Sequence, residues 1–165
     1  MKRLLAVLAA AVCFAAIGVS ASSGSAPTVI SFFPCVGPNG GSETVPAGTT
    51  VVLRAGWVAK SRGLIEDWFN DVTTTAALNG KPVANADSLW TSPISLDPYW
   101  ETNQYYSLGT LGAGQSETLT LHWTLSHPYW DGITFNPDGS RQVSPAGIDL
   151  VSFDFGGSSC TITGN

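Results

Sequence analysis

The chain has 165 residues, of which 44% are hydrophobic and only 12% are charged, with a formal net charge of −5 at pH 7. If residues 1–21 are removed as a signal peptide, five basic residues remain against twelve acidic ones, a net charge of −7. Nucleic-acid binding depends on the neutralisation of phosphates by basic side chains, so this balance excludes a nucleic-acid partner. The same acidic balance gives no attraction to an anionic membrane surface.

The first residues have the pattern of a secretory signal peptide. Lys2 and Arg3 precede an apolar run from residue 4 to residue 19, and small residues lead up to Ala21. This pattern predicts export and cleavage after Ala21, with cleavage as late as Ala26 as the alternative. A membrane anchor is the competing interpretation, but the run is shorter than the roughly 20 residues of a spanning helix. We therefore expect residues 22–165 to form one secreted, monomeric domain that does not insert into a membrane.

The first half of this domain predicts strands. Residues 28–33 form a β-branched and aromatic run that ends at Pro34. A turn at residues 46–48 precedes a long alternating strand over residues 49–59. One face of that strand carries Val51, Leu53, Ala55 and Trp57. We expect this face to point into the core.

The sequence then changes to a helical period. Leu64, Ile65, Trp68 and Phe69 recur at helical spacing, which predicts a short helix around residues 64–70. This helix would lie across one end of the domain, with Trp68 as its plug. Residues 73–78 return to a strand pattern, and the dipeptide at residues 79–80, Asn-Gly, predicts a type I′ hairpin turn.

Residues 85–103 are the least regular part, and we expect a loop with one short strand there, followed by a strand over residues 104–108. The stretch from Glu117 to Leu125 alternates without a fault. Its apolar face consists of Leu119, Leu121, Trp123 and Leu125. This pattern predicts the central core strand of a second sheet, opposite the strand at residues 49–59.

The C-terminal part predicts a hairpin and a last long strand. Residues 133–135 and 141–143 flank the turn sequence Asn-Pro-Asp-Gly. Residues 148–155 are interpreted as a strand with Val151, Phe153 and Phe155 facing inward. Altogether the sequence predicts an all-β fold, a two-sheet sandwich of about 8–9 antiparallel strands with one short helix. A closed barrel is the competing architecture, which the uneven strand lengths disfavour.

Two cysteines remain after signal cleavage, Cys35 and Cys160. In an oxidising compartment such a pair forms a disulfide, here one that closes almost the whole domain. A catalytic or metal-binding thiol is the alternative, but no C-x-x-C motif and no nearby histidine accompany either cysteine.

Two segments resemble the start of bacterial extracellular immunoglobulin-like domains, namely residues 27–32 and residues 45–57. The turn at residues 111–114 before a threonine-rich strand is similar to the corner between strands E and F of such domains. The resemblance implies an immunoglobulin-like sandwich over residues 22–165. It implies no particular function, because this fold carries many functions.

No G-x-S-x-G, H-E-x-x-H or P-loop motif occurs in the sequence. The two histidines are His122 and His127, and Ser126 beside His127 lies at a strand end without a nucleophile elbow. We therefore expect a non-catalytic protein. A hydrolase that uses an unrecognised pair of carboxylates is the remaining enzymatic alternative.

A crowded group of acidic residues, Glu66, Asp67 and Asp71, is a weak candidate for calcium binding. The competing interpretation places these side chains on the solvated face of the predicted helix. Since no calcium-loop motif accompanies them, we expect no metal ion and no cofactor.

Aromatic residues outside the alternating strands are the candidates for carbohydrate binding. They are Trp90, Tyr99, Trp100, Tyr129 and Trp130. Trp100 and Trp130 are the best of these candidates because each follows a tyrosine, although such rings can also close the ends of a sandwich. We expect a secreted binding module for an extracellular protein or a polysaccharide, with any binding in residues 85–103 and 126–132.

Overall fold

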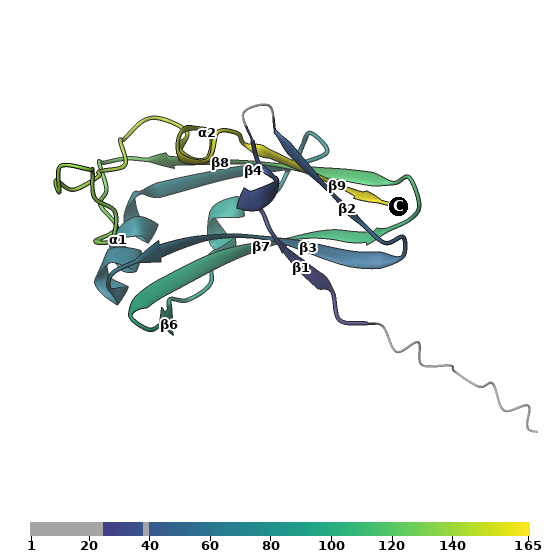
Figure 1. The fold of residues 1–165 in the computed structure, drawn as a ribbon, viewed down its shortest axis with the longest axis horizontal. Helices are drawn as coiled ribbons and strands as arrows, with labels where there is room; N and C mark the ends of the chain where they lie inside the picture. The colour runs from purple at the N-terminus through teal and green to yellow at the C-terminus, as the bar shows by residue number, and fades with distance from the viewer. Residues whose placement is uncertain (1–24, 38–39) are drawn as a thin grey trace, which may run out of the picture.

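The computed structural model describes residues 25–37 and 40–165, so the predicted signal peptide at residues 1–21 lies outside the described part. Two β-sheets form two layers, which lie one above the other in Figure 1. The four-stranded sheet has the order β1-β3-β7-β6 and the five-stranded sheet the order β2-β9-β8-β4-β5. Within the described ranges, no helix is long and apolar enough to cross a membrane.

The elements have the following bounds. The four-stranded sheet consists of β1 (Thr28–Ser31), β3 (Thr49–Ala59), β7 (Tyr99–Leu111) and β6 (Ile94–Leu96). The five-stranded sheet consists of β2 (Gly41–Val45), β9 (Ser159–Gly164), β8 (Ser116–Leu125), β4 (Val72–Leu78) and β5 (Lys81–Pro82). Two α-helices, α1 (Arg62–Asp71) and α2 (Leu150–Phe155), and two short 3-10 helices, η1 (Phe33–Cys35) and η2 (Ala86–Leu89), complete the fold.

Both sheets are mixed, so the prediction of purely antiparallel strands is wrong. β1 pairs with β3 in parallel, and β2 pairs with β9 in parallel. The order of the strands in the chain explains the parallel pairing. β1 and β2 follow one another in the chain but belong to different layers. The chain therefore reaches β3 from β1 by a crossover through the other sheet, which is the kind of connection that parallel pairing requires.

The alternating strands pack face to face, as predicted. Leu53 of β3 and Leu121 of β8 are fully buried, as are most of their inward-facing neighbours. The rings of Trp57 and Trp123 meet between the two sheets with their centroids 6.1 Å apart. The predicted core strand at residues 117–125 is therefore confirmed as the centre of the five-stranded sheet, between β9 and β4.

Helix α1 lies at one end of the two layers (Figure 1). It begins after Ser61, whose side-chain oxygen accepts a hydrogen bond from the backbone N–H of Leu64 at 3.3 Å. Its apolar side buries Ile65 and Trp68 completely. The predicted helix and its plug are confirmed, with bounds slightly wider than residues 64–70.

The predicted Asn-Gly turn is also confirmed, between β4 and β5. Asn79 has a φ of 51° and Gly80 a φ of 75°, as a type I′ turn requires. The side-chain carbonyl of Asn79 accepts a hydrogen bond from the backbone N–H of Thr118 at 2.9 Å. The turn is thereby fixed to the start of β8.

The predicted strand at residues 148–155 is wrong, because α2 occupies most of it. The Asp149 carboxylate accepts hydrogen bonds from the backbone N–H groups of Val151 (3.2 Å) and Ser152 (3.3 Å), which starts a helical turn. Gly156, with a φ of 76°, ends the helix. Phe153 is consequently 63% exposed and does not face the core.

Strand β7 is longer than predicted and includes residues 99–103, which we expected in a loop. Its pairing with β3 extends to the contact of Trp100 with Ala59. The irregular segment before it contains η2 and the short strand β6. The predicted hairpin around residues 136–139 is reduced to one bridge between Phe135 and Arg141, although the turn itself forms.

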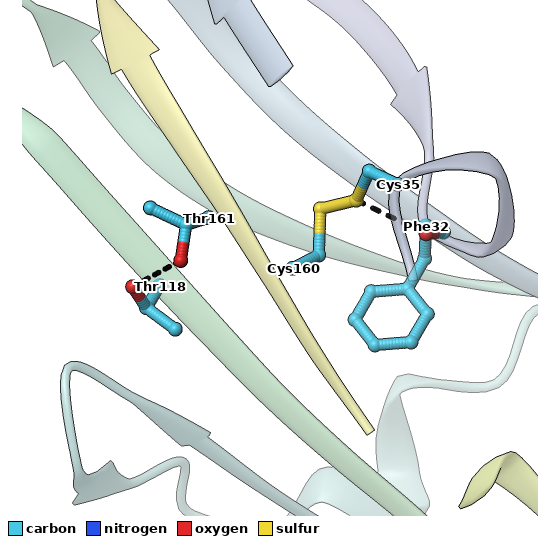
Figure 2. The surroundings of a disulfide bond; sticks show 5 residues. All are labelled: Phe32, Cys35, Thr118, Cys160 and Thr161. Atoms are coloured by element: carbon cyan, nitrogen blue, oxygen red, sulfur yellow. Dashed lines mark hydrogen bonds between the residues drawn. A yellow bond between two sulfur atoms is a disulfide. The ribbon is translucent and has the colours of Figure 1, made fainter. Parts of the chain in front are cut away.

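The predicted disulfide between Cys35 and Cys160 is confirmed, with a Cα–Cα distance of 5.6 Å (Figure 2). It joins η1, directly after β1, to β9 in the other sheet. The two cysteines are 125 positions apart in the chain. In the chain-entropy description, closure of so long a loop stabilises the fold by roughly 4–5 kcal/mol.

Candidate functional site

Part of the outer edge of β3 has no neighbouring strand. β1 pairs with β3 only as far as Arg54, whose carbonyl accepts a hydrogen bond from the N–H of Phe32 at 2.8 Å. At the other end, the N–H of Lys60 donates to the carbonyl of Asp131 at 2.8 Å. Between these two contacts, no described strand pairs with β3 on this side.

The backbone groups without a strand partner in this interval belong to Gly56 and Val58. Successive residues of a strand direct their N–H and C=O groups to opposite edges. Since Arg54 and Lys60 both use the outer edge, the two even-numbered residues between them face it as well. Two N–H donors and two C=O acceptors are thus directed away from β7 into the open interval.

A cavity of about 400 Å³ lies against this interval, and we call it the β3 cleft. Gly56, Trp57 and Val58 form one wall. A second wall consists of the rings of Phe33 and Phe155, which stack with their centroids 4.0 Å apart. The remaining wall is polar and consists of Asp131, Thr134, Gln142, Ser144 and Asp154.

The loop that carries Asp131 packs closely on the end of β3. At Gly132, where φ is 80°, a Cβ atom would lie only 2.5 Å from Cβ of Lys60. Glycine is therefore required both by the backbone conformation and by the close contact. This contact positions residues 131–134 as the far wall of the cleft.

The carboxylate of Asp131 stabilises its own loop. One of its oxygens accepts hydrogen bonds from the backbone N–H groups of Ile133 (2.7 Å) and Thr134 (2.8 Å). The other oxygen accepts a hydrogen bond from the hydroxyl of Thr134 at 2.5 Å. Both oxygens of Asp131 are thus used within the turn.

Asp154 on α2 is different, because no hydrogen bond from the described residues acts on its carboxylate. Burial raises the pKa of Asp154 above its usual value, and the neighbouring charge of Asp131 raises it further. Asp154 as a residue is exposed, so water screens part of this effect. No basic side chain lines the cleft, which leaves Asp154 as its free negative charge.

The five aromatic residues predicted for carbohydrate binding do not form one platform. Trp90 packs edge-on against Trp68 in the core, and its indole N–H donates to the hydroxyl of Thr74 at 3.2 Å. Tyr129 is only 4% exposed, and its hydroxyl donates to the carbonyl of Leu64 at 2.7 Å. Tyr129 therefore belongs to the core, and Trp90 is half-buried and packs against the core.

The other three rings are half-buried, and a basic side chain lies over each of them. Lys60 Nζ lies 5.5 Å from the ring centroid of Tyr99, and the guanidinium of Arg62 lies 6.0 Å from that of Trp100. The guanidinium of Arg141 lies 4.2 Å from the ring centroid of Trp130. Each ring therefore has one face covered by a cation.

Comparisons with known proteins give no match: no protein-family model, no curated protein and no solved structure is similar to the chain. The functional assignment therefore rests on the geometry of the chain's own residues.

Ser126, His127 and Asp71 lie together at the end of β8, but not as a catalytic relay. Nδ1 of His127 lies 2.9 Å from the carboxylate of Asp71 and 3.0 Å from the hydroxyl of Ser126. A serine–histidine–aspartate relay needs the two partners on different ring nitrogens. Hydrogen bonds from His127 and Ser126 hold the pKa of Asp71 below its usual value. Because Asp71 is the last residue of α1 and the other two residues follow β8, the same hydrogen bonds connect the end of β8 to α1.

The calcium candidates are engaged elsewhere or exposed. Glu66 accepts a hydrogen bond from the guanidinium of Arg62 at 2.9 Å, and Asp71 belongs to the cluster with His127. Asp67 is exposed on α1. In the part of the chain that the structure describes, no three acidic, histidine or cysteine side chains are grouped for a metal ion.

Sequence reasoning missed the β3 cleft for two reasons. The sequence pattern places Asp154 and Phe155 in a strand, and the open edge of β3 depends on where β1 ends. The capping pair Asp149 and Ser152 was the signal for the helix, because an aspartate three residues before a serine suits a helix start. Only Asp131 of the cleft lies in a segment where we expected binding.

Proposed function

We propose that the protein is a secreted, non-catalytic, immunoglobulin-like module that binds an extracellular ligand in the β3 cleft. The observation that carries this proposal is the cavity of about 400 Å³ against the unpaired backbone of Gly56 and Val58. Ligand sites typically have volumes of about 300–1,000 Å³ and combine apolar walls with a few polar groups. The aromatic pair Phe33 and Phe155 and the free carboxylate of Asp154 match that description.

Secretion is supported by the predicted signal peptide and by the disulfide between Cys35 and Cys160. Disulfides persist mainly in oxidising compartments outside the cytosol. The immunoglobulin-like character is supported by the two packed sheets and by the sequence resemblance over residues 27–32 and 45–57.

The arrangement of the carboxylates favours binding over hydrolysis. A glycoside hydrolase needs two carboxyl groups that are free to act on the substrate. In the cleft, the hydrogen bonds of Asp131 engage both of its oxygens, so Asp154 alone is available. The cluster around Ser126 offers no nucleophile activated by a histidine in the required geometry.

A cleft-filling variant tests the proposal. A phage-displayed peptide library and a set of insoluble polysaccharides are exposed to immobilised wild-type protein and to Gln142→Trp. Gln142 lines the cleft and is exposed, so a tryptophan there fills the cavity without disturbing the core. The matched control is Thr73→Trp, at an exposed position of β4 outside the cleft.

We expect ligands that bind the wild type and Thr73→Trp but not Gln142→Trp. Binding that is equal in all three proteins would contradict a site in the cleft. Polysaccharide binding that disappears in Trp100→Ala or Trp130→Ala would instead support the carbohydrate-binding alternative.

A further inference from the structure

The polar groups of the β3 cleft are arranged at strand spacing. Gly56 and Val58 each present one N–H and one C=O on the same edge, two residues apart. A ligand that displaces water from these groups must replace their hydrogen bonds, because an unpaired buried backbone group is costly. An extended peptide repeats a donor and an acceptor at this same spacing and pairs with all four groups.

The open interval limits the length of the pairing segment. It is closed by β1 at Arg54 and by the loop at Asp131, which holds Lys60. Residues 55–59 of β3 lie between these two contacts, so at about 3.3 Å per residue the space is roughly 16 Å long and accommodates at most about five residues of an added strand. A longer straight strand would meet β1 at one end and the loop at the other, so the occupant pairs through a short segment.

The charge of the cleft selects among peptides. Asp154 has no hydrogen-bond partner among the described residues, and no basic side chain lines the cavity. The rings of Phe33 and Phe155 provide apolar surface in the same cavity. A lysine or arginine side chain can pack its alkyl stem on such a surface while its charged end reaches a carboxylate.

Resting on the proposed function of the cleft, we infer that its ligand is a short extended peptide of a partner protein. This peptide adds as a strand to the open edge of β3 at Gly56 and Val58 and places a lysine or arginine side chain beside Asp154.

The first experiment uses the secreted domain labelled with ¹⁵N and titrated with acetyl-Val-Lys-Val-amide at millimolar concentration. We expect the amide signals of Gly56 and Val58 to shift and their hydrogen exchange to slow, because their N–H groups become hydrogen bonded. The absence of these changes, or changes confined to another edge such as β6, would overturn the inference.

Two altered peptides separate the contribution of the backbone hydrogen bonds from that of the lysine charge. The fully N-methylated peptide keeps the side chains but has no backbone donors, and we expect roughly tenfold weaker binding or none. Acetyl-Val-Glu-Val-amide reverses the charge, and we expect a similar loss through repulsion by Asp154. Equal binding of all three peptides would refute strand addition with a basic residue.

The matched protein variants are Asp154→Asn and Asp67→Asn, both at exposed positions. Asp154→Asn is expected to lose the preference for the lysine peptide over the glutamate peptide, whereas Asp67→Asn is expected to keep it. If both variants keep the preference, the assignment of Asp154 is wrong.

These results are distinguishable from failure of the proposed function. If Gln142→Trp removes binding of a non-peptide ligand while the peptides never shift Gly56 or Val58, the cleft is a binding site but the inferred ligand class is wrong. If no ligand depends on the cleft, the proposed function itself fails.

Discussion

The indole rings of Trp57 and Trp68 stack in parallel, with their centroids 4.1 Å apart and their planes inclined by 6°. This contact fastens α1 to the inner face of β3. Both rings also meet the edge of Trp123, so the two sheets and the helix share one aromatic cluster. Trp57 of this cluster also lines the β3 cleft, so the cleft lies directly beside the packed aromatic rings.

The variant Trp68→Ala is expected to lower the free energy of unfolding by about 3–5 kcal/mol, because it leaves a large cavity in a fully buried position. Urea denaturation followed by circular dichroism measures this loss. Phe69→Ala, in the same helix but only half-buried, serves as the control and should cost clearly less. Equal losses would contradict the role of Trp68 as the plug.

The variant Leu121→Asp is expected to prevent folding, since it buries a charge without a partner at the centre of β8. The control is Thr120→Asp, one residue away on the opposite and half-exposed face. Thermal unfolding of both variants gives the answer. A wild-type-like transition for Leu121→Asp would mean that β8 faces the other way.

The sequence predicted those features of the fold that depend on neighbouring residues. The alternation of β8, the helical spacing around Trp68 and the Asn79–Gly80 turn are local, and each forms as expected. The sequence does not predict helix α2, because its apolar residues also suit a strand. The hydrogen bonds from the backbone N–H groups of Val151 and Ser152 to Asp149 favour the helix over the strand. The parallel pairing of β1 with β3 and of β2 with β9 depends on which layer each strand joins, which no local pattern specifies.

The cleft was beyond sequence reasoning for a related reason. Its open edge exists because β1 stops at the level of Arg54, and its far wall exists because Gly132 permits contact with Lys60. Both are tertiary relationships between segments far apart in the chain. The aromatic residues, by contrast, were found by type alone, and type does not show whether a ring is covered by a cation.

Calcium is expected to leave the stability unchanged. Glu66 is paired with Arg62, and Asp71 is hydrogen bonded by His127 and Ser126, so neither carboxylate is free to join a calcium site. Calcium needs six to eight oxygen ligands in total. Differential scanning calorimetry in calcium and in EDTA should give the same unfolding midpoint. A higher midpoint in calcium would show a site that these contacts do not predict.

The stability is expected to fall in acid partly through Asp149. Burial alone would raise the pKa of Asp149, but hydrogen bonds from Ser152 and His122 and the charge of His122 outweigh burial and lower it below 3.8. A carboxyl group whose pKa is lower in the folded state stabilises the fold above its unfolded pKa. That contribution disappears as the pH falls through the folded pKa.

The test compares the free energy of unfolding of the wild type and Asp149→Asn between neutral pH and pH values below 3.8. Asparagine keeps the helix cap but cannot titrate, so the variant should lose less stability in this range than the wild type. Asp67→Asn, on the exposed face of α1, should retain the wild-type dependence. Identical curves for all three proteins would exclude Asp149 as a source of the acid sensitivity.

Alanine substitutions at two glycines with similar backbone conformations distinguish the cost of backbone strain from the cost of a steric clash. Gly132 has a φ of 80° and Gly139 a φ of 83°, so alanine at either position costs about 1–2 kcal/mol in backbone strain. A Cβ at Gly139 meets nothing within 4 Å, whereas a Cβ at Gly132 would lie 2.5 Å from Cβ of Lys60. Gly132→Ala should therefore lose more stability than Gly139→Ala, and the loop at residues 131–134 should move away from β3.

Urea denaturation measures the difference, and peptide binding to Gly132→Ala reports whether the cleft wall has moved. If the two variants lose the same stability, the close contact between Gly132 and Lys60 does not hold the loop in place.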